Sequence, residues 1–128
     1  GLFELTERIH KYGALASIQL NHAGASAYPE RLGGLQSVSS SSVPSKEGNP
    51  APRPLTKQEI LNIVQKYADA AERAIGAGFD MVEIHGGHSY LLDQFLSPLY
   101  NKRTDEFGGS YENRARFARL VVESVRSR

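Results

Sequence analysis

The sequence contains no cysteine, no tryptophan and only one methionine. Without cysteine, these residues can form no disulfide, no thiolate zinc site and no thiolate-bound iron–sulfur cluster. No apolar run approaches the length of a membrane-spanning helix, and no signal-peptide pattern is present. The charges nearly cancel, with 15 Lys and Arg against 14 Asp and Glu, so nothing favours a nucleic acid or an anionic membrane as partner. We expect a cytoplasmic protein whose partner is a small molecule.

The stretch with the most chemistry runs from Val82 to Tyr90 and reads V-E-I-H-G-G-H-S-Y. It is preceded by a short apolar run, residues 79–84, which is typical of a buried parallel strand. His85 follows that run directly. In parallel α/β proteins the reactive groups gather at the carboxyl ends of strands, because the loops there open into one shared crevice. His85 is therefore a candidate site residue.

The residues alone leave three interpretations of this stretch open. His85, His88 and Tyr90 supply two N–H donors and one hydroxyl, a set that can polarise a carbonyl oxygen and deliver a proton. The two histidines can equally form a structural hydrogen-bonding pair. A closed metal site takes about three or four ligands, so here it would need His10, His22 or a carboxylate as well. We predict no metal.

The first part of the chain predicts a helix, a strand and a long loop. Apolar residues recur at helical spacing and predict a helix packed on a sheet: Leu2, Leu5, Ile9 and Tyr12. Gly13 is the expected C-cap. Residues 14–20 predict a strand in which Gln19 is the polar exception. Residues 21–55 hold five of the six prolines and the run S-V-S-S-S-S, and they predict a loop with Tyr28 and Arg31 in solvent.

A second strand and two more helices are expected to complete an α/β arrangement. Thr56 and Glu59 have capping-box spacing and predict a helix with an apolar stripe from Ile60 to Ile75. The strand at residues 79–84 then returns parallel to the strand at residues 14–20, which gives one β-α-β unit. A short helix is predicted within residues 89–99, ended by Pro98, and a last helix follows Ser110. Between these helices, Arg103 and Asp105 are expected to hold a rigid loop.

The run from Ile84 to Arg116, together with the Q-L-x-H-A-G segment that begins at Gln19, closely resembles the signature of the Old Yellow Enzyme family of FMN-dependent ene-reductases. This resemblance implies a (β/α)8 TIM barrel, which normally needs about 250 residues. Residues 1–128 are therefore expected to be a fragment, about a third to a half of an FMN-binding barrel domain. We expect strands 3 and 4 of the barrel with their flanking helices, and a long loop at residues 21–55.

The same resemblance assigns roles to four residues. It implies that Gln19 binds the pyrimidine ring of FMN, that His85 and His88 bind the carbonyl oxygen of the substrate, and that Tyr90 donates a proton. NADH or NADPH is the implied reductant, and activated C=C bonds of enones or enoates are the implied substrates. The sequence departs from the family pattern at Ala25, where many relatives have arginine, and it has Ser89 where glycine is common.

The length of the chain leaves a second function open. The full-length protein is expected to be an NAD(P)H:flavin oxidoreductase, while the isolated 128 residues are expected to be inactive and free of flavin. The alternative is a non-catalytic partial barrel that self-associates through open sheet edges.

Overall fold

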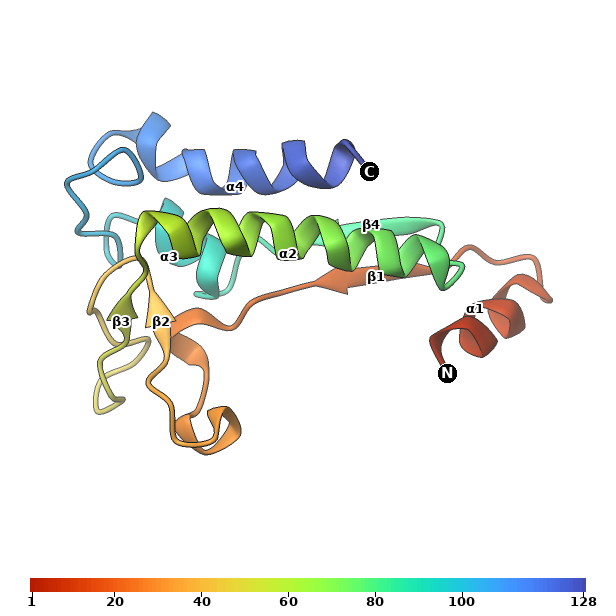
Figure 1. The fold of residues 1–128 in the computed structure, drawn as a ribbon. Helices are drawn as coiled ribbons and strands as arrows, with labels where there is room; N and C mark the ends of the chain where they lie inside the picture. Colours follow the sequence, from red (N-terminus) through yellow and green to blue (C-terminus); the bar gives the residue numbers. More distant parts are fainter.

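A parallel β-α-β unit forms the centre of the computed structural model, which describes residues 1–128. The unit consists of strand β1 (Ser17–Leu20), helix α2 (Lys57–Gly76) and strand β4 (Met81–Ile84). The two strands pair in parallel, with Ser17 opposite Met81 and Leu20 opposite Ile84. Figure 1 shows α2 running along the sheet. The predicted β-α-β unit is confirmed, although both strands are shorter than expected; their numbering within a barrel stays a prediction.

The capping box at the start of α2 forms as predicted. The Thr56 hydroxyl accepts a hydrogen bond from the Glu59 backbone N–H at 3.2 Å, and the Glu59 carboxylate accepts one from the Thr56 backbone N–H at 2.8 Å. Arg53 adds a two-pronged ion pair to the same carboxylate, at 2.7 and 3.0 Å. Together, these contacts satisfy backbone donors that the first turn of a helix leaves free.

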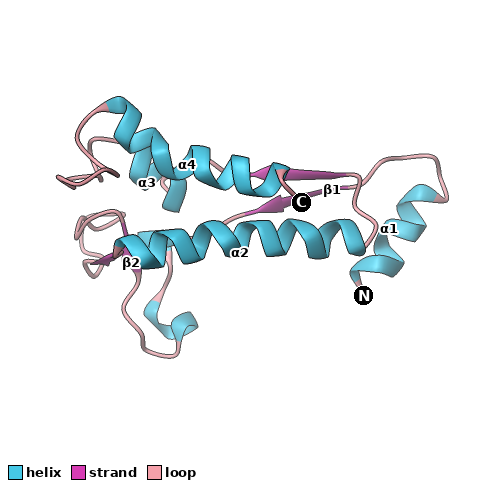
Figure 2. Ribbon diagram, turned by 45° about the horizontal axis from the view of Figure 1, so that its top comes forward, coloured by secondary structure: helices cyan, strands magenta, loops and turns pink.

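The main core lies between three helices. Helix α4 (Tyr111–Arg126) packs against both α2 and α3 (Leu91–Leu96), and it runs along α2 in Figures 1 and 2. Nine buried residues make up this core: Leu55, Ile60, Tyr67, Leu91, Leu92, Phe95, Phe107, Phe117 and Val121. The rings of Phe95 and Phe117 meet edge to face with centroids 4.7 Å apart. Ser110 caps α4 as predicted, accepting from the Asn113 backbone N–H.

The loop between α3 and α4 is held by polar side chains, as predicted. Arg103 pairs with Asp105, and its guanidinium also donates to the backbone carbonyls of Ser40 and Leu55. The buried amide of Asn101 donates to the carbonyls of Phe95 and Phe107. These bonds tie the loop to α3 and to the segment that precedes α2.

The long loop predicted over residues 21–55 is interrupted by short regular elements. The segment contains two 3-10 helices, η1 (Gly24–Ser26) and η2 (Pro29–Leu32), and two short strands, β2 (Val38–Ser39) and β3 (Arg53–Pro54), which pair in parallel. The serine run is largely buried, because its hydroxyls bond to groups in α3 and in the loop that follows it. These partners lie far along the chain, and no local pattern reveals them.

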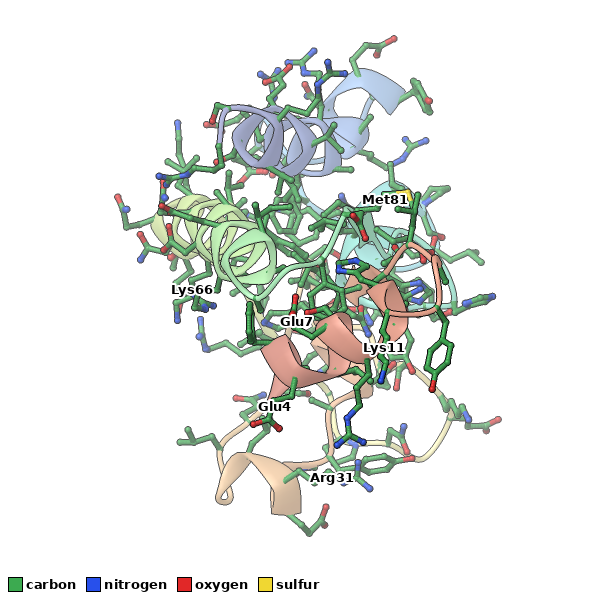
Figure 3. All side chains as sticks on the ribbon, turned by 90° about the vertical axis from the view of Figure 1, so that its right-hand side faces the viewer. Glu4, Glu7, Lys11, Arg31, Lys66 and Met81 are labelled. Carbon is green, nitrogen blue, oxygen red and sulfur yellow. The ribbon has the colours of Figure 1, made fainter.

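The apolar face predicted for the first helix packs only in part: Ile9 lies against the small cluster of Ala16, Ala74 and Phe79. Helix α1 (Leu2–His10) leaves Leu2 and Leu5 about half exposed, and Tyr12 is 84% exposed. Its one buried residue is Thr6, whose hydroxyl donates to the Ala77 carbonyl at 2.7 Å. Gly13 is not the C-cap, since the helix ends at Lys11. Figure 3 labels two charged residues of α1, Glu4 and Glu7, and its C-cap, Lys11.

One face of the β1–β4 sheet is open. Ile18, Leu20, Val82 and Ile84 face inward, while Ser17, Gln19, Met81 and Glu83 are exposed. Figure 3 shows Met81 on the side of the sheet away from Lys66 of α2. Near the C-terminus of α2, Ile75 is 58% exposed. The apolar stripe predicted for α2 from Ile60 to Ile75 therefore ends before Ile75. None of the helices is both long and apolar enough to cross a membrane.

The capping box predicts a specific response to acid. The hydrogen bond from Arg53 and those from Thr56 lower the pKa of Glu59 to about 2. Because the folded pKa lies below the unfolded value, the contribution of Glu59 to stability is complete above about pH 4.5 and is lost as the pH falls through about 2. We expect Glu59→Gln to flatten the fall in thermal midpoint between these values. Glu47→Gln removes a carboxylate without hydrogen bonds, and it should leave the profile unchanged.

Thr6 of α1 packs so closely on Gly78, just after α2, that adding a methyl group at Gly78 should destabilise the protein. Gly78 has a φ of +85°, and an added Cβ would lie 2.7 Å from the Thr6 hydroxyl. Gly48 has a similar φ of +83° with nothing nearby, so Gly48→Ala reports backbone strain alone. We expect Gly78→Ala to lower the free energy of unfolding by about 1–3 kcal/mol more than Gly48→Ala. Equal losses in urea denaturation would contradict the close packing.

Candidate active site

The candidate site begins on the open face of the sheet, where Gln19 lies opposite Glu83 in neighbouring strands. The Gln19 amide nitrogen donates to the Glu83 carboxylate at 3.0 Å, while its amide oxygen has no hydrogen-bond partner in the chain. Both side chains are exposed on this face. Glu83 therefore orients the Gln19 amide and leaves the amide oxygen and one N–H available to a ligand.

His85, His88 and Tyr90 converge just beyond the carboxyl end of β4. The ring centroids of His85 and His88 lie 5.3 Å apart, and those of His85 and Tyr90 lie 5.2 Å apart. The backbone N–H of His85 donates to the Leu20 carbonyl at 3.0 Å, so the parallel pairing of the strands fixes where the group begins. The structure thus brings together the three side chains that the sequence selected, and their roles stay a prediction.

Hydrogen bonding separates the four histidines into two kinds. His10 bonds to the Asp80 carboxylate at 2.8 Å, and Nδ1 of His22 accepts from the Gly24 backbone N–H at 3.0 Å. The ring nitrogens of His85 and His88 have no partner within the chain, and neither has the Tyr90 hydroxyl. A ring nitrogen that is hydrogen-bonded within the protein is already occupied, whereas an unbonded one can bind a ligand. This contrast favours His85 and His88 as ligand-binding residues.

The turn that carries His88 is strained. His88 and Ser89 have φ values of 55° and 58°, and they are the only residues other than glycine with positive φ. Each such residue costs on the order of 1–3 kcal/mol, so the surrounding structure must hold it in place. The Asp93 carboxylate accepts from the Ser89 backbone N–H at 2.7 Å, and the Gln94 amide donates to the Ser89 carbonyl at 2.5 Å. The sequence analysis missed both of these α3 residues; a glutamine beside Phe95 on a buried face was the available signal.

Residues from the segment between β1 and α2 cover one side of the site. The β2–β3 ladder and its loops lie at the end of the molecule toward which β1 points in Figure 1. A cavity of about 330 Å³ lies between this segment and the turn after β4. Its lining is mostly polar: Ser26, Tyr28, Ser45, Lys46, Asn49, His88, Ser89 and Tyr90. Tyr28 is exposed, as predicted, and it faces this cavity, with the Arg31 guanidinium 5.7 Å from its ring centroid.

A second cavity, of about 250 Å³, lies beside α2 and contains none of the predicted site residues. It is lined in part by His22, Lys66 and Tyr67. Burial and the nearby Lys66 charge lower the pKa of His22, and burial raises the pKa of Tyr67 to about 12. Both groups are therefore neutral at neutral pH, and the accepting role of His22 Nδ1 agrees with a structural histidine. No group of three His, Asp or Glu side chains is arranged to hold a metal ion.

Known proteins share both the sequence and the fold of this chain. Over 126 residues it is 47% identical to an NADH oxidase of Thermoanaerobacter brockii and 48% identical to an NADPH dehydrogenase of Clostridium acetobutylicum. Each match covers 98% of this chain, but 19% of the oxidase and 36% of the dehydrogenase. The chain therefore spans about a fifth and about a third of those two relatives.

The solved structures agree with the sequence matches. Morphinone reductase superposes with a TM-score of 0.94 and 37% identity, covering 99% of this chain and 38% of that protein. A structure of morphinone reductase in complex with tetrahydroNAD matches with a TM-score of 0.92 and the same identity. The sequence profile described as the NADH:flavin oxidoreductase / NADH oxidase family matches residues 1–128 in full. The resemblance inferred from the motifs is thus confirmed, and the chain belongs to the NADH:flavin oxidoreductase / NADH oxidase family.

Proposed function

We propose that this chain is the segment of an FMN-dependent oxidoreductase that holds the activated alkene, and that its β-α-β unit is part of a (β/α)8 barrel. The reaction is the reduction of a C=C bond conjugated to a carbonyl group, as in an enone or enoate, with NADH or NADPH as reductant. The observation that carries this proposal is the convergence of two unbonded imidazoles and one unbonded phenol, of which His88 and Tyr90 line a polar cavity. Membership of the family supports it.

The two imidazoles bind the carbonyl oxygen of the substrate. When the β-carbon of an enone receives a hydride, negative charge grows on that oxygen. His85 and His88 each offer a ring N–H to it, and donors placed before the reaction stabilise this charge more than they stabilise the neutral carbonyl. Tyr90 then supplies a proton to the α-carbon.

The Gln19 amide fits a flavin ring. An isoalloxazine presents a carbonyl oxygen beside a ring N–H at its pyrimidine end, and the free Gln19 oxygen and remaining N–H match that pair. Bound FMN supplies the hydride. Gln19, anchored by Glu83 on the open face of the sheet, holds the pyrimidine edge, while the turn from His85 to Tyr90 holds the substrate at the carboxyl end of β4.

Loss of one donor tests the role of the imidazoles. In the full-length enzyme we expect His85→Ala to slow enone reduction by about 10²- to 10³-fold, the usual effect of removing one donor to a developing oxyanion. Binding of a phenol should weaken, and the FMN content should stay the same. Stopped-flow kinetics of flavin reoxidation by a cyclic enone measure the effect. His10→Ala, which removes a histidine bonded to Asp80, is the control. Wild-type reoxidation kinetics in the His85 variant would contradict the proposal.

A specific observation also favours the alternative function, a partial barrel that self-associates. Strands β1 and β4 pair only with each other, so each has an unpaired edge. Leu15 is 70% exposed and Met81 is 50% exposed beside those edges. Unpaired edges with apolar side chains are templates for association between chains.

The isolated 128-residue chain tests the alternative function. We expect it to contain no flavin and to elute above its 14.0 kDa monomer mass in size-exclusion chromatography, because one amide and one turn cannot enclose an FMN. The measurement is an FMN titration followed by flavin fluorescence. A purified chain that is yellow and monomeric would contradict this expectation.

A further inference from the structure

Gln94 connects three segments that surround the candidate site. Its side chain is completely buried in α3, and both of its polar atoms are bonded. The amide oxygen accepts from the Ala25 backbone N–H at 3.0 Å and from the Ser39 hydroxyl at 2.8 Å. The amide nitrogen donates to the Ser89 carbonyl at 2.5 Å. The exit of β1, strand β2 and the turn after β4 therefore meet at one amide.

The partners determine the orientation of this amide. A backbone N–H such as that of Ala25 can only donate, so it must face the Gln94 oxygen. A backbone carbonyl such as that of Ser89 can only accept, so it must face the nitrogen. Methionine is similar in length but offers neither group, so it would lose the two accepted bonds and the donated bond together.

The hydrogen bond that Gln94 donates acts on the strained turn at His88 and Ser89. Ser89 stands between His88 and Tyr90, and both His88 and Ser89 have left-handed backbone angles. The Ser89 carbonyl also accepts from the Ser26 hydroxyl at the longer distance of 3.2 Å, and its N–H is held by Asp93. The Gln94 bond is thus the shorter of the two that fix the carbonyl side of the strained turn.

We propose that Gln94 is a positioning residue for the reaction: by donating to the Ser89 carbonyl, it holds His88 and Tyr90 in the orientation that faces His85. This inference rests on the proposed function and extends it, because Gln94 itself touches neither substrate nor cofactor. Without the bond, the turn relaxes and the two side chains lose their shared target. The chemistry then slows, although the protein still folds and still binds its flavin.

The test compares two half-reactions in the full-length FMN enzyme. We expect Gln94→Met, which removes the donor to the Ser89 carbonyl, to slow flavin reoxidation by a cyclic enone roughly ten- to hundredfold, the cost of misplacing reacting groups by about 1 Å. Reduction of the flavin by NAD(P)H should stay close to the wild-type rate, because it needs no proton from Tyr90. Amide hydrogen exchange at Ser89 and Tyr90 should become faster in the absence of substrate. Ser40→Ala removes a neighbouring buried bond, to the Gln94 backbone carbonyl at 2.6 Å, and should lower the thermal midpoint without changing either rate.

A second variant protects the test against misfolding. Ser26→Ala removes the weaker donor to the same carbonyl from a partly buried position, and it should slow reoxidation by about two- to fivefold with the same selectivity. Wild-type reoxidation in both variants, or an equal slowing of both half-reactions, would overturn the inference while leaving the proposed function intact. A wild-type enzyme that reduces no enone would overturn both.

Discussion

The parallel pairing of β1 with β4 is the constraint on which the candidate site depends. Its register places Gln19 beside Glu83 and carries the His85 backbone to the end of β1. Parallel strands need a long crossover, and here the crossover includes both α2 and the segment that covers the site. A shift of register by one residue would turn Gln19 to the covered face of the sheet, because side chains alternate along a strand.

Buried polar side chains connect the core to the loops that carry the candidate site. Arg103, Asn101 and Gln94 each bond to backbone groups of two or more segments, and each is largely enclosed by the core. Buried polar groups without partners are costly, so such residues fit only one arrangement of the loops around them. The strained turn at His88 and Ser89 persists because this arrangement holds it from both sides.

The side chains of the candidate site differ from the other histidines in having no hydrogen-bond partner within the chain. His10, His22 and the serines of residues 39–41 are bonded within the chain, whereas His85, His88 and Tyr90 are not. These three rings lie together, His88 and Tyr90 line a cavity, and the open amide edge of Gln19 lies on the sheet that ends at His85. The family to which the chain belongs is consistent with a flavin and a nicotinamide cofactor meeting at such a site.

The sequence by itself determined the elements with local signals: the capping box at Thr56, the stripe of α2, the strand before His85 and the group of candidate site residues. Only the tertiary structure decided that α1 leaves its leucines exposed, that serines 39–41 are buried, and that Gln94 joins three segments. The physical reason is range. A cap or an amphipathic stripe involves residues within a few positions, whereas the partners of Gln94 include residues 25 and 39, which local patterns do not relate to it.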